Sequence, residues 1–442
     1  MGLSVKKARK QLSADALFQT LHSGFEEIVD GRVGKPAIPL ADALMSAFAM
    51  FSLKDPSALA FDERRSDPND NFRTIYRIGR VPCDTQMRAI LDPIDPDSLR
   101  TSYTEVFRRV QRGKVLEDFV FFDDCYLLAL DGTGYFSSNT IHCESCMVKH
   151  HSNGSISYYH QLLGAALVHP DFKEVIPLAP EPIIKQDGHV KNDCERNATR
   201  RWLKHFRQDH PHLKVIVVED ALSSNAPHLC DLREANVHFI LGVKPGDHAF
   251  LFRHLREADE EGRTQTLTQI DPDTGILHHY RWNCDQPLNE SNADVLVNVL
   301  EYWEIHPDGE IQYFSWITDL PLTIDTVYLI MRGGRARWKI ENETFNTLKN
   351  QGYHLEHNFG HGEKNLSVVL AMLMMLAFFV DQVQQRCCPL FQAARKKTRT
   401  NRYLWEKIRA LFETMVFASM SHLLLALAQG IVRQPPVLAD ST

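Results

Sequence analysis

The spacing of hydrophobic residues divides the chain into helical ends and a β-rich middle. Up to about residue 115, apolar residues recur at helical spacing, as in ALMSAFAMFSL. From Tyr126 the pattern changes to short apolar runs, interrupted by an amphipathic helical segment, CERNATRRWLKHFRQDH. The runs lie at 126–130, 158–168, 174–179, 213–219 and 238–243. With a second helix-like stretch before the last run, the pattern predicts the order βββαβαβ.

Two of these apolar runs end in an aspartate. YLLAL precedes Asp131, and LKVIVVE precedes Asp220. Because a crossover helix joins neighbouring parallel strands, we expect both strands to be parallel and both aspartates to lie at their carboxyl ends. Two adjacent carboxylates repel each other unless a cation lies between them, and oxygen ligands suit Mg²⁺ or Mn²⁺. The alternative is that each aspartate forms a turn or a helix N-cap after its strand.

The pattern changes twice more toward the C-terminus. Residues 244 to about 325 mix turns with β-like pieces, and helical spacing resumes near Val327. The apolar run LSVVLAMLMMLAFFV, at 366–380, is shorter than the roughly 20 residues that a membrane span needs. It therefore predicts a buried core helix.

A third carboxylate lies in the predicted helix RGGRARWKIENETFNTLKN. At about 100° per residue, Glu341 falls on the apolar face and Glu343 falls on a different one. A carboxylate on an apolar face needs a partner, because unpaired burial costs several kcal/mol. Arg337, one turn earlier, could supply an ion pair; a metal shared with Asp131 and Asp220 is the alternative. The apolar stripe is expected to hold Arg337, Trp338, Glu341, Phe345 and Leu348, and the polar stripe Lys339, Asn342, Asn346 and Lys349.

The charge distribution narrows the class of partner. A formal net charge of −7 excludes a uniformly basic nucleic-acid binder. Positive charge is nevertheless concentrated in two windows, at 332–349 and at 395–409. The second window holds seven Lys or Arg and one Glu. Such basic windows are suited to binding a polyanion. Nine scattered cysteines, an odd count, indicate reduced thiols, and the basic N-terminus leads into no apolar signal region. These features predict a cytoplasmic protein.

Three of these segments carry a family resemblance. In this order and on this strand–helix pattern, LALDGT, VIVVEDALSSN and RARWKIENETFNTLK resemble the DDE transposases of bacterial insertion sequences. The resemblance extends from about residue 120 to residue 365 and includes the segment TDLPL, which precedes the helix that carries Glu341. It implies an α/β fold with an RNase H-like mixed sheet flanked by helices. A β-rich insertion interrupts the sheet before the glutamate helix, and the N- and C-terminal regions are helical.

The resemblance also implies the active site. Asp131, Asp220 and Glu341 correspond to the catalytic acids, which would hold two Mg²⁺ or Mn²⁺ ions for cutting and joining phosphodiester bonds. The group's Tyr-x2-Arg-x3-Glu-x6-Lys signature keeps Arg337 and Glu341. Gly334 replaces the tyrosine, and Lys349 lies one residue beyond the expected lysine position. Glu343 therefore remains the alternative to Glu341.

The partner that the resemblance implies is double-stranded DNA, both at the transposon ends and at the target. It also implies that the protein is a homodimer in the DNA complex. When bound to DNA, the protein would be associated with the bacterial nucleoid. The alternative function is a non-catalytic DNA-binding protein on the same fold, such as a repressor or a domesticated remnant. Bringing three acids together costs free energy, and a protein without catalytic activity has no physical reason to keep them. The three acids therefore favour the enzyme. The residues expected to bind DNA are Arg337, Lys339, Asn342, Asn346, Lys349, Lys396 and Lys397.

The predicted domain organisation follows these changes of pattern. It consists of a helical DNA-binding domain at 1–115, the first part of the catalytic domain at 116–243, the β-rich insertion at 244–325, the glutamate helix with the closing helices at 326–390, and a helical C-terminal region at 391–442.

Two further motifs each have two interpretations. In IHCESCMVKHH, Cys143 and Cys146 with His150 have a spacing that suits Zn²⁺, but a single CxxC also fits a loop with reduced thiols. Trp282 or Trp316 could stack on an unpaired base at a transposon end, or belong to the core.

Overall fold

The chain folds into two compact units. The computed structural model describes residues 10–66, 70–183, 185 and 194–430. Unit 1 combines Met1–Gly113 with Leu348–Thr442, and unit 2 is Lys114–Thr347. The later boundary between the units therefore falls within the predicted segment 326–390.

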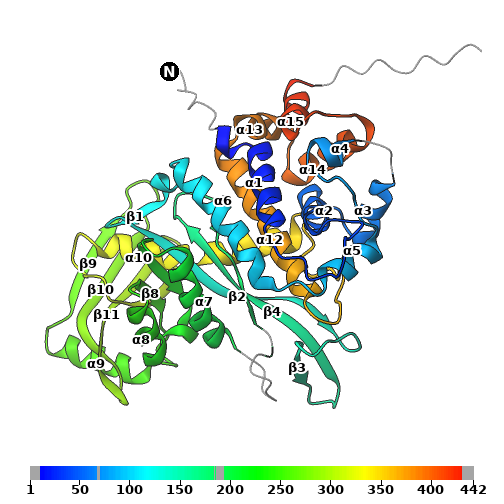
Figure 1. Ribbon diagram of the computed structural model, residues 1–442. Coiled ribbons are helices and arrows are strands. Elements are labelled where there is room, and N and C mark those ends of the chain that lie inside the picture. Colours follow the sequence, from blue (N-terminus) through cyan, green and yellow to red (C-terminus); the bar gives the residue numbers. More distant parts are fainter. Residues whose placement is uncertain (1–9, 67–69, 184, 186–193, 431–442) are drawn as a thin grey trace, which may run out of the picture. The chain divides into compact units, whose positions relative to one another are not determined.

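Unit 2 is built on a mixed 12-stranded sheet (Figure 1). The order of its main path is β3-β4-β2-β7-β8-β12-β11-β10-β9, and β1, β5 and β6 pair at its margins. β2 with β7 and β7 with β8 are parallel, and the other pairs are antiparallel. The strands are β1 Val120–Phe122, β2 Cys125–Ser138, β3 Met147–His150, β4 Ile156–Val168, β5 Ile176–Pro177, β6 Glu181–Ile183, β7 Val215–Glu219, β8 His238–Gly242, β9 Gln265–Ile270, β10 Leu277–Asn289, β11 Asn292–Ile305 and β12 Ile311–Thr318.

Helices cover both faces of the sheet near β2. A Cβ at Gly333 would lie 3.3 Å from Leu127, whereas a Cβ at Gly132 would lie 2.1 Å from Glu195. Positions 127 and 132 of β2 face opposite sides because side chains alternate along a strand. The helix that carries Gly333 and the helix that begins at Glu195 therefore lie on opposite faces. The helices of unit 2 are α7 Glu195–Asp209, α8 Ala226–Glu234, α9 Ala249–Glu260 and α10 Val327–Ala336.

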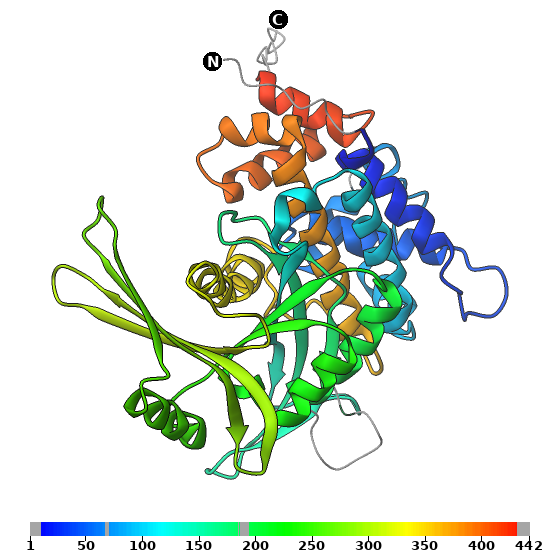
Figure 2. The ribbon, with the colours of Figure 1, turned by 90° about the vertical axis from the view of Figure 1, so that its left-hand side faces the viewer.

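The insertion extends the central sheet. β12 pairs with β8 in antiparallel register, so β9 to β12 continue the same hydrogen-bonded sheet. In Figure 2 these strands run away from the other strands of the unit toward the left of the view. The segment is β-rich, as predicted, and it also contains α9.

The prediction that Asp131 lies at the carboxyl end of its strand is wrong. β2 runs on through Gly132, Thr133 and Gly134 to Ser138, because β4 pairs with it along this length, with Asp131 opposite Gly164. Pairing with β7, by contrast, ends at Ala129. Asp131 thus lies in the middle of a long strand, at the point where that strand loses its parallel neighbour.

Unit 1 is helical and is built around the apolar run near residue 370. α12 lies beside α1 and α2, as Figure 1 shows (orange and blue). α12 is long and apolar enough to cross a membrane, but 94% of its most apolar stretch is buried, which confirms the predicted core helix. The main helices of the unit are α1 Ala14–Glu26, α2 Leu40–Leu53, α3 Ala58–Arg65, α5 Asp84–Leu91, α6 Arg100–Arg112, α12 Leu366–Cys387, α13 Pro389–Lys396, α14 Asn401–Thr414 and α15 Met420–Gln429.

A buried ion pair joins α2 to α12 in this unit. Lys54 follows α2 with a left-handed φ of 59°, and its Nζ lies 2.5 Å from Asp381 Oδ2. The ammonium also lies over the rings of Tyr353 and Trp405, and the Tyr353 hydroxyl donates to Asp381. Burial lowers the pKa of Lys54 and raises that of Asp381, while the attraction between them opposes both shifts. Each group therefore depends on the other to remain charged.

We expect Asp381→Asn to lower the free energy of unfolding by about 3–5 kcal/mol, because it leaves the Lys54 ammonium buried without its partner. The measurement is urea denaturation at neutral pH. Glu406→Gln, which breaks the exposed pair between Arg402 and Glu406, is the control and should change stability by about 0–1 kcal/mol. Equal effects of the two substitutions would contradict a structural role for the buried pair.

Candidate active site

The register of β2 and β7 brings Asp131 and Asp220 to the same edge of the sheet. Ala129 pairs with Val218 in parallel register, and each aspartate lies two residues further along the chain. Both aspartates line one cavity of about 540 Å³, together with Glu195 and Glu219. The predicted parallel arrangement is confirmed, and two carboxylates meet where it ends.

Local hydrogen bonds occupy one oxygen of each aspartate. Asp220 Oδ1 accepts from the backbone N–H of Leu222 at 2.9 Å and caps the short 3-10 helix η4 (Ala221–Ser223). Asp131 Oδ1 accepts from the N–H of Gly132 at 2.8 Å. Asp220 thus forms the N-cap that its sequence position suggested, and capping leaves its second oxygen available to a ligand.

Arg337 links Asp131 to Glu341. Its Nη1 lies 2.6 Å from Glu341 Oε1 and 3.4 Å from Asp131 Oδ2. A Cβ at Gly164, the residue opposite Asp131, would meet the ring of Phe345, so the glutamate segment packs directly over this part of the sheet. The guanidinium occupies the position between two carboxylates where a cation is needed. Glu341 is not among the residues that line the cavity of the two aspartates.

The helix that carries Glu341 is not regular. α10 ends at Ala336, and Ile340–Phe345 forms a π-helical turn (η5) before α11 (Asn346–Asn350). A π turn holds one more residue than an α turn, so a projection at 100° per residue fails across it. Trp338, expected on the buried stripe, is 51% exposed, and that expectation is wrong. Phe345 and Leu348 are buried as expected.

A fourth carboxylate, Glu195, enters the site from the first residue of α7. A Cβ at position 132 would lie 2.1 Å from Glu195 Oε1, so the close approach requires glycine there. Burial raises the pKa of Glu195, and the charges of Asp220 and Glu219 raise it further. The sequence contained one signal of this contact, a glycine directly after Asp131, but nothing that indicated which side chain it admits.

Burial also affects the charge of Asp131. It raises the pKa of this carboxyl group to about 7; Glu341 and Glu195 contribute in the same direction, and Arg337 opposes them. In the lining of the cavity, Glu219 and His228 form a buried pair at 2.6 Å. Although burial opposes charging of His228, the carboxylate of Glu219 raises its pKa. Glu219 therefore has a partner of its own in His228, whereas Asp131 shares Arg337 with Glu341.

Most cationic side chains of the first basic window are held by the protein itself. Lys339 donates to the carbonyl of Phe172 at 2.6 Å, and its burial lowers its pKa. Arg332 pairs with Asp171, Arg335 with Glu304, and Lys349, which belongs to unit 1, with Glu356. Asn342 and Asn346 are exposed.

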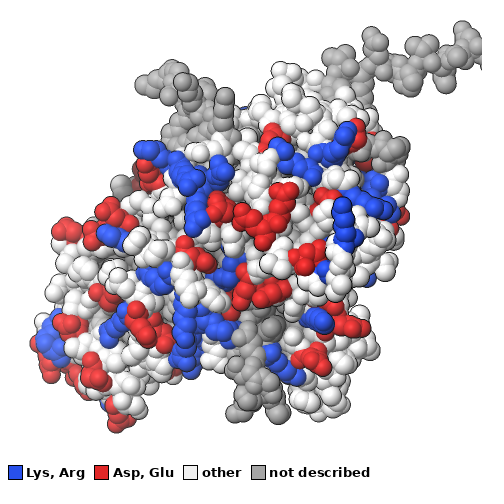
Figure 3. Space-filling model, in the orientation of Figure 1, with Lys and Arg blue, Asp and Glu red and all other residues white. Residues whose placement is uncertain are grey.

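The second basic window, in unit 1, is more open. Arg395 and Arg409 donate to backbone carbonyls and serve the fold. Lys396, Lys397 and Arg399 are exposed. Figure 3 shows Lys and Arg interspersed with Asp and Glu on the face that it displays, so no single sign of charge covers that face.

The aromatic and cysteine candidates are placed as follows. Trp282 and Trp316 are 3% and 6% exposed, which confirms their core interpretation. His150 is exposed at the end of β3, whereas Cys143 and Cys146 contact His160 of β4.

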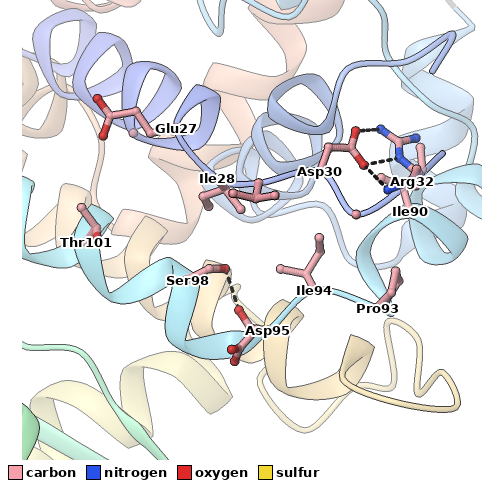
Figure 4. Close-up of a pocket in the computed structure, with 13 residues that line it drawn as sticks. Glu27, Ile28, Asp30, Arg32, Ile90, Pro93, Ile94, Asp95, Ser98 and Thr101 are labelled. Carbon is pink, nitrogen blue, oxygen red and sulfur yellow. Dashed lines mark hydrogen bonds and ion pairs between the residues drawn. The ribbon is translucent and has the colours of Figure 1, made fainter. Parts of the chain in front are cut away.

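A second cavity, of about 570 Å³, lies in unit 1 and contains none of the predicted catalytic acids. Figure 4 shows its lining, in which Asp30 pairs with Arg32 and Ser98 donates to the backbone carbonyl of Asp95. The carboxylate cavity of unit 2 is therefore the candidate active site.

Comparisons with known proteins identify the family of the chain. Residues 142–379 match the family described as Transposase DDE domain, a range that includes Asp220 and Glu341 and begins after Asp131. No curated protein matches the chain.

Among solved structures, the piggyBac transposase in its synaptic complex with hairpin DNA is similar at 12% identity and a TM-score of 0.39, over 98% of this chain and 88% of that one. The NurA nuclease from Sulfolobus solfataricus is similar at 11% identity and a TM-score of 0.24, over 57% of this chain and 89% of that one. The assignment rests on the family match. Because that match spans more than half of the 442 residues, the chain belongs to the DDE transposases, metal-dependent enzymes that cut and join DNA.

Proposed function

We propose that Asp131, Asp220 and Glu341 are the catalytic acids of this transposase and that they hold two Mg²⁺ or Mn²⁺ ions. The observation that carries the proposal is the cluster of carboxylates on one sheet edge, where the guanidinium of Arg337 is the cation between Asp131 and Glu341. Carboxylate oxygens are the ligands that both metals prefer. Glu195, in the same cavity, is a further oxygen donor.

When bound, the ions would supply an activated water or DNA 3′-hydroxyl and stabilise the leaving oxygen of the phosphodiester. The residues of the chain orient the carboxylate oxygens and balance their charge. Asp131 and Asp220 each keep one oxygen in a local hydrogen bond, which fixes the direction of the other. Arg337 holds Glu341 one turn away and is positioned to contact a phosphate once a metal takes over its carboxylates.

We further propose that the substrate is the double-stranded DNA of insertion-sequence ends and their target, bound by a homodimer in the bacterial cytoplasm. The exposed lysines at the C-terminal end of α13, Lys396 and Lys397, support contacts to the phosphate backbone, which position DNA without reading its sequence. Arg337, Lys339, Asn342, Asn346 and Lys349 are proposed to contact DNA near the cut. In the DNA-free protein Lys339 and Lys349 have protein partners, which DNA must replace.

Glu341→Gln should abolish strand cleavage while folding and DNA binding persist, because the lost charge weakens a metal ligand. Glu343→Gln, two residues along the same π turn, is the matched control and should cleave nearly as well as the wild type. The measurements are cleavage of a labelled DNA end in Mg²⁺ and a thermal melt of each variant. An active Glu341→Gln that melts early would show that Glu341 serves only the ion pair with Arg337.

The raised pKa of Asp131 predicts how stability depends on pH in the absence of divalent ions. The folded pKa of about 7 lies above the ordinary value of 3.8, so the folded state binds this proton more tightly than the unfolded state. Ionising Asp131 therefore costs stability as pH rises between these two values, and the full cost remains above pH 7. Melting temperatures of wild type and Asp131→Asn, in chelator, should diverge over this range in favour of the variant.

Mg²⁺ should remove much of that difference, because it favours the ionised carboxylate and stabilises the folded state by mass action. Glu195→Gln should make the pH-dependent loss of stability smaller and complete it at lower pH than in the wild type, since it removes one of the charges that raise the pKa of Asp131. Parallel pH profiles for wild type and Asp131→Asn would show that Asp131 ionises without cost.

DNA affinity should fall steeply with salt, since phosphate contacts release counterions. Reversing the charges of Lys396 and Lys397 should weaken binding to all sequences alike and reduce the slope of log K against log salt by about 2, if each contacts one phosphate. Lys35→Glu, an exposed lysine of the same unit outside the basic window, is the control. Fluorescence anisotropy over a salt series measures both effects. A slope unchanged by the double reversal would exclude this surface from the DNA interface.

A further inference from the structure

A cluster of metal-ligating side chains lies in unit 2, on the β2–β3–β4 meander, and the transposition chemistry does not use it. Cys143 and Cys146 lie in the loop between β2 and β3, and His160 lies on β4. The two Sγ atoms are 3.8 Å apart, and His160 Nε2 is 3.5 Å from Cys143 Sγ and 3.3 Å from Cys146 Sγ. Three good zinc ligands thus point at a common centre.

These separations match those around a tetrahedral zinc ion. With Zn–S of about 2.3 Å and Zn–N of about 2.0–2.1 Å, tetrahedral angles place two sulfurs about 3.8 Å apart and a sulfur and a nitrogen about 3.6 Å apart. A disulfide would need the sulfurs at about 2.05 Å, so the cysteines are reduced. Hydrogen bonding alone explains this arrangement less well, because a single proton on Nε2 cannot point at two sulfur acceptors at once. One cation can bind all three atoms.

The surroundings fix the ligands in place. The N–H of Cys146 donates to the carbonyl of Cys143 at 3.2 Å, which closes the CxxC turn, and the N–H of Cys143 donates to Cys146 Sγ at 3.4 Å. Hydrogen bonds to ligand sulfurs are a regular feature of metal centres. Cys146 and His160 are each 1% exposed, and the ring of Tyr135 stacks on that of His160 at 5.9 Å between centroids. The ligands are therefore arranged before any ion binds.

We propose that Cys143, Cys146 and His160 hold a structural Zn²⁺ ion that ties the β2–β3 loop to β4. The ligand from β4 is His160, ten residues beyond the His150 that spacing suggested, because the chain turns at 151–155 and β4 runs back antiparallel to β3, with Met147 opposite Tyr159. The fourth coordination position is left to water or to a further side chain. The ion would stabilise the four-residue strand β3, which lies at the end of the sheet's main path among the described residues and pairs there with β4.

The test uses the full chain purified without chelator. Elemental analysis should find one tightly bound zinc per chain, and Co²⁺ in its place should give the sulfur-to-metal charge-transfer absorption of a thiolate site. X-ray absorption should show two sulfurs at about 2.3 Å and nitrogen at about 2.0–2.1 Å. These measurements on the wild type do not depend on any variant folding. A wild-type protein without stoichiometric zinc, or cobalt without thiolate absorption, overturns the proposal.

Variants then assign the ligands. Cys146→Ser and His160→Asn should each lose the zinc and melt at lower temperature, with no recovery in Mg²⁺. His150→Ala is the matched control, an exposed histidine at the end of β3, and should retain the ion. Asp131→Asn should also retain it, which separates this site from the carboxylate site. Zinc that persists in His160→Asn and disappears in His150→Ala would assign the site to the CxxC and His150 instead.

Discussion

Electrostatic repulsion among carboxylates is the constraint around which unit 2 is organised. Asp131, Asp220, Glu195 and Glu219 line one cavity, and Glu341 joins Asp131 through Arg337. Such a group is unfavourable unless positive charge is close, because burial and like charges both disfavour ionisation. Glu219 has His228, and Asp131 and Glu341 share one arginine. Because this edge holds more acids than cations, it suits the divalent ions that the proposed function assigns to it.

The sheet and the glutamate helix supply the positions that this arrangement needs. Parallel pairing of β2 with β7 sets Asp131 level with Asp220, and Gly132 leaves room for Glu195 on the opposite face of β2. The π turn at Ile340–Phe345 adds one residue to the helix. Lys349 lies one residue beyond its position in the family signature, and a single extra residue after Glu341 is what a π turn accommodates. The irregular turn therefore reconciles the displaced lysine with a continuing helix.

The proposed zinc site and Asp131 lie on the same pair of strands, β2 and β4. Asp131 of β2 is paired with Gly164 of β4, and His160 is paired with Phe136 a short distance along the same ladder. Because β2 extends far beyond its parallel neighbour β7, its distal half depends on β4 for support. An ion that fixes the loop and β4 at that end would limit fraying of the ladder toward Asp131.

The sequence by itself determined the features that local pattern controls. Apolar runs and crossover helices predicted the parallel pair of β2 and β7, and the run at 366–380 predicted the core helix, whereas the short strands β1, β3 and β6 were not predicted. The sequence pattern could not predict contacts between segments that are distant along the chain. Glu195, the partners of Arg337 and Lys339, and His160 all depend on which side chains the fold brings within a few ångströms, and no periodicity carries that information. The continuation of β2 through Gly-Thr-Gly and the π turn were likewise decided by tertiary pairing, because cross-strand hydrogen bonds and packing against the sheet outweigh local backbone preference.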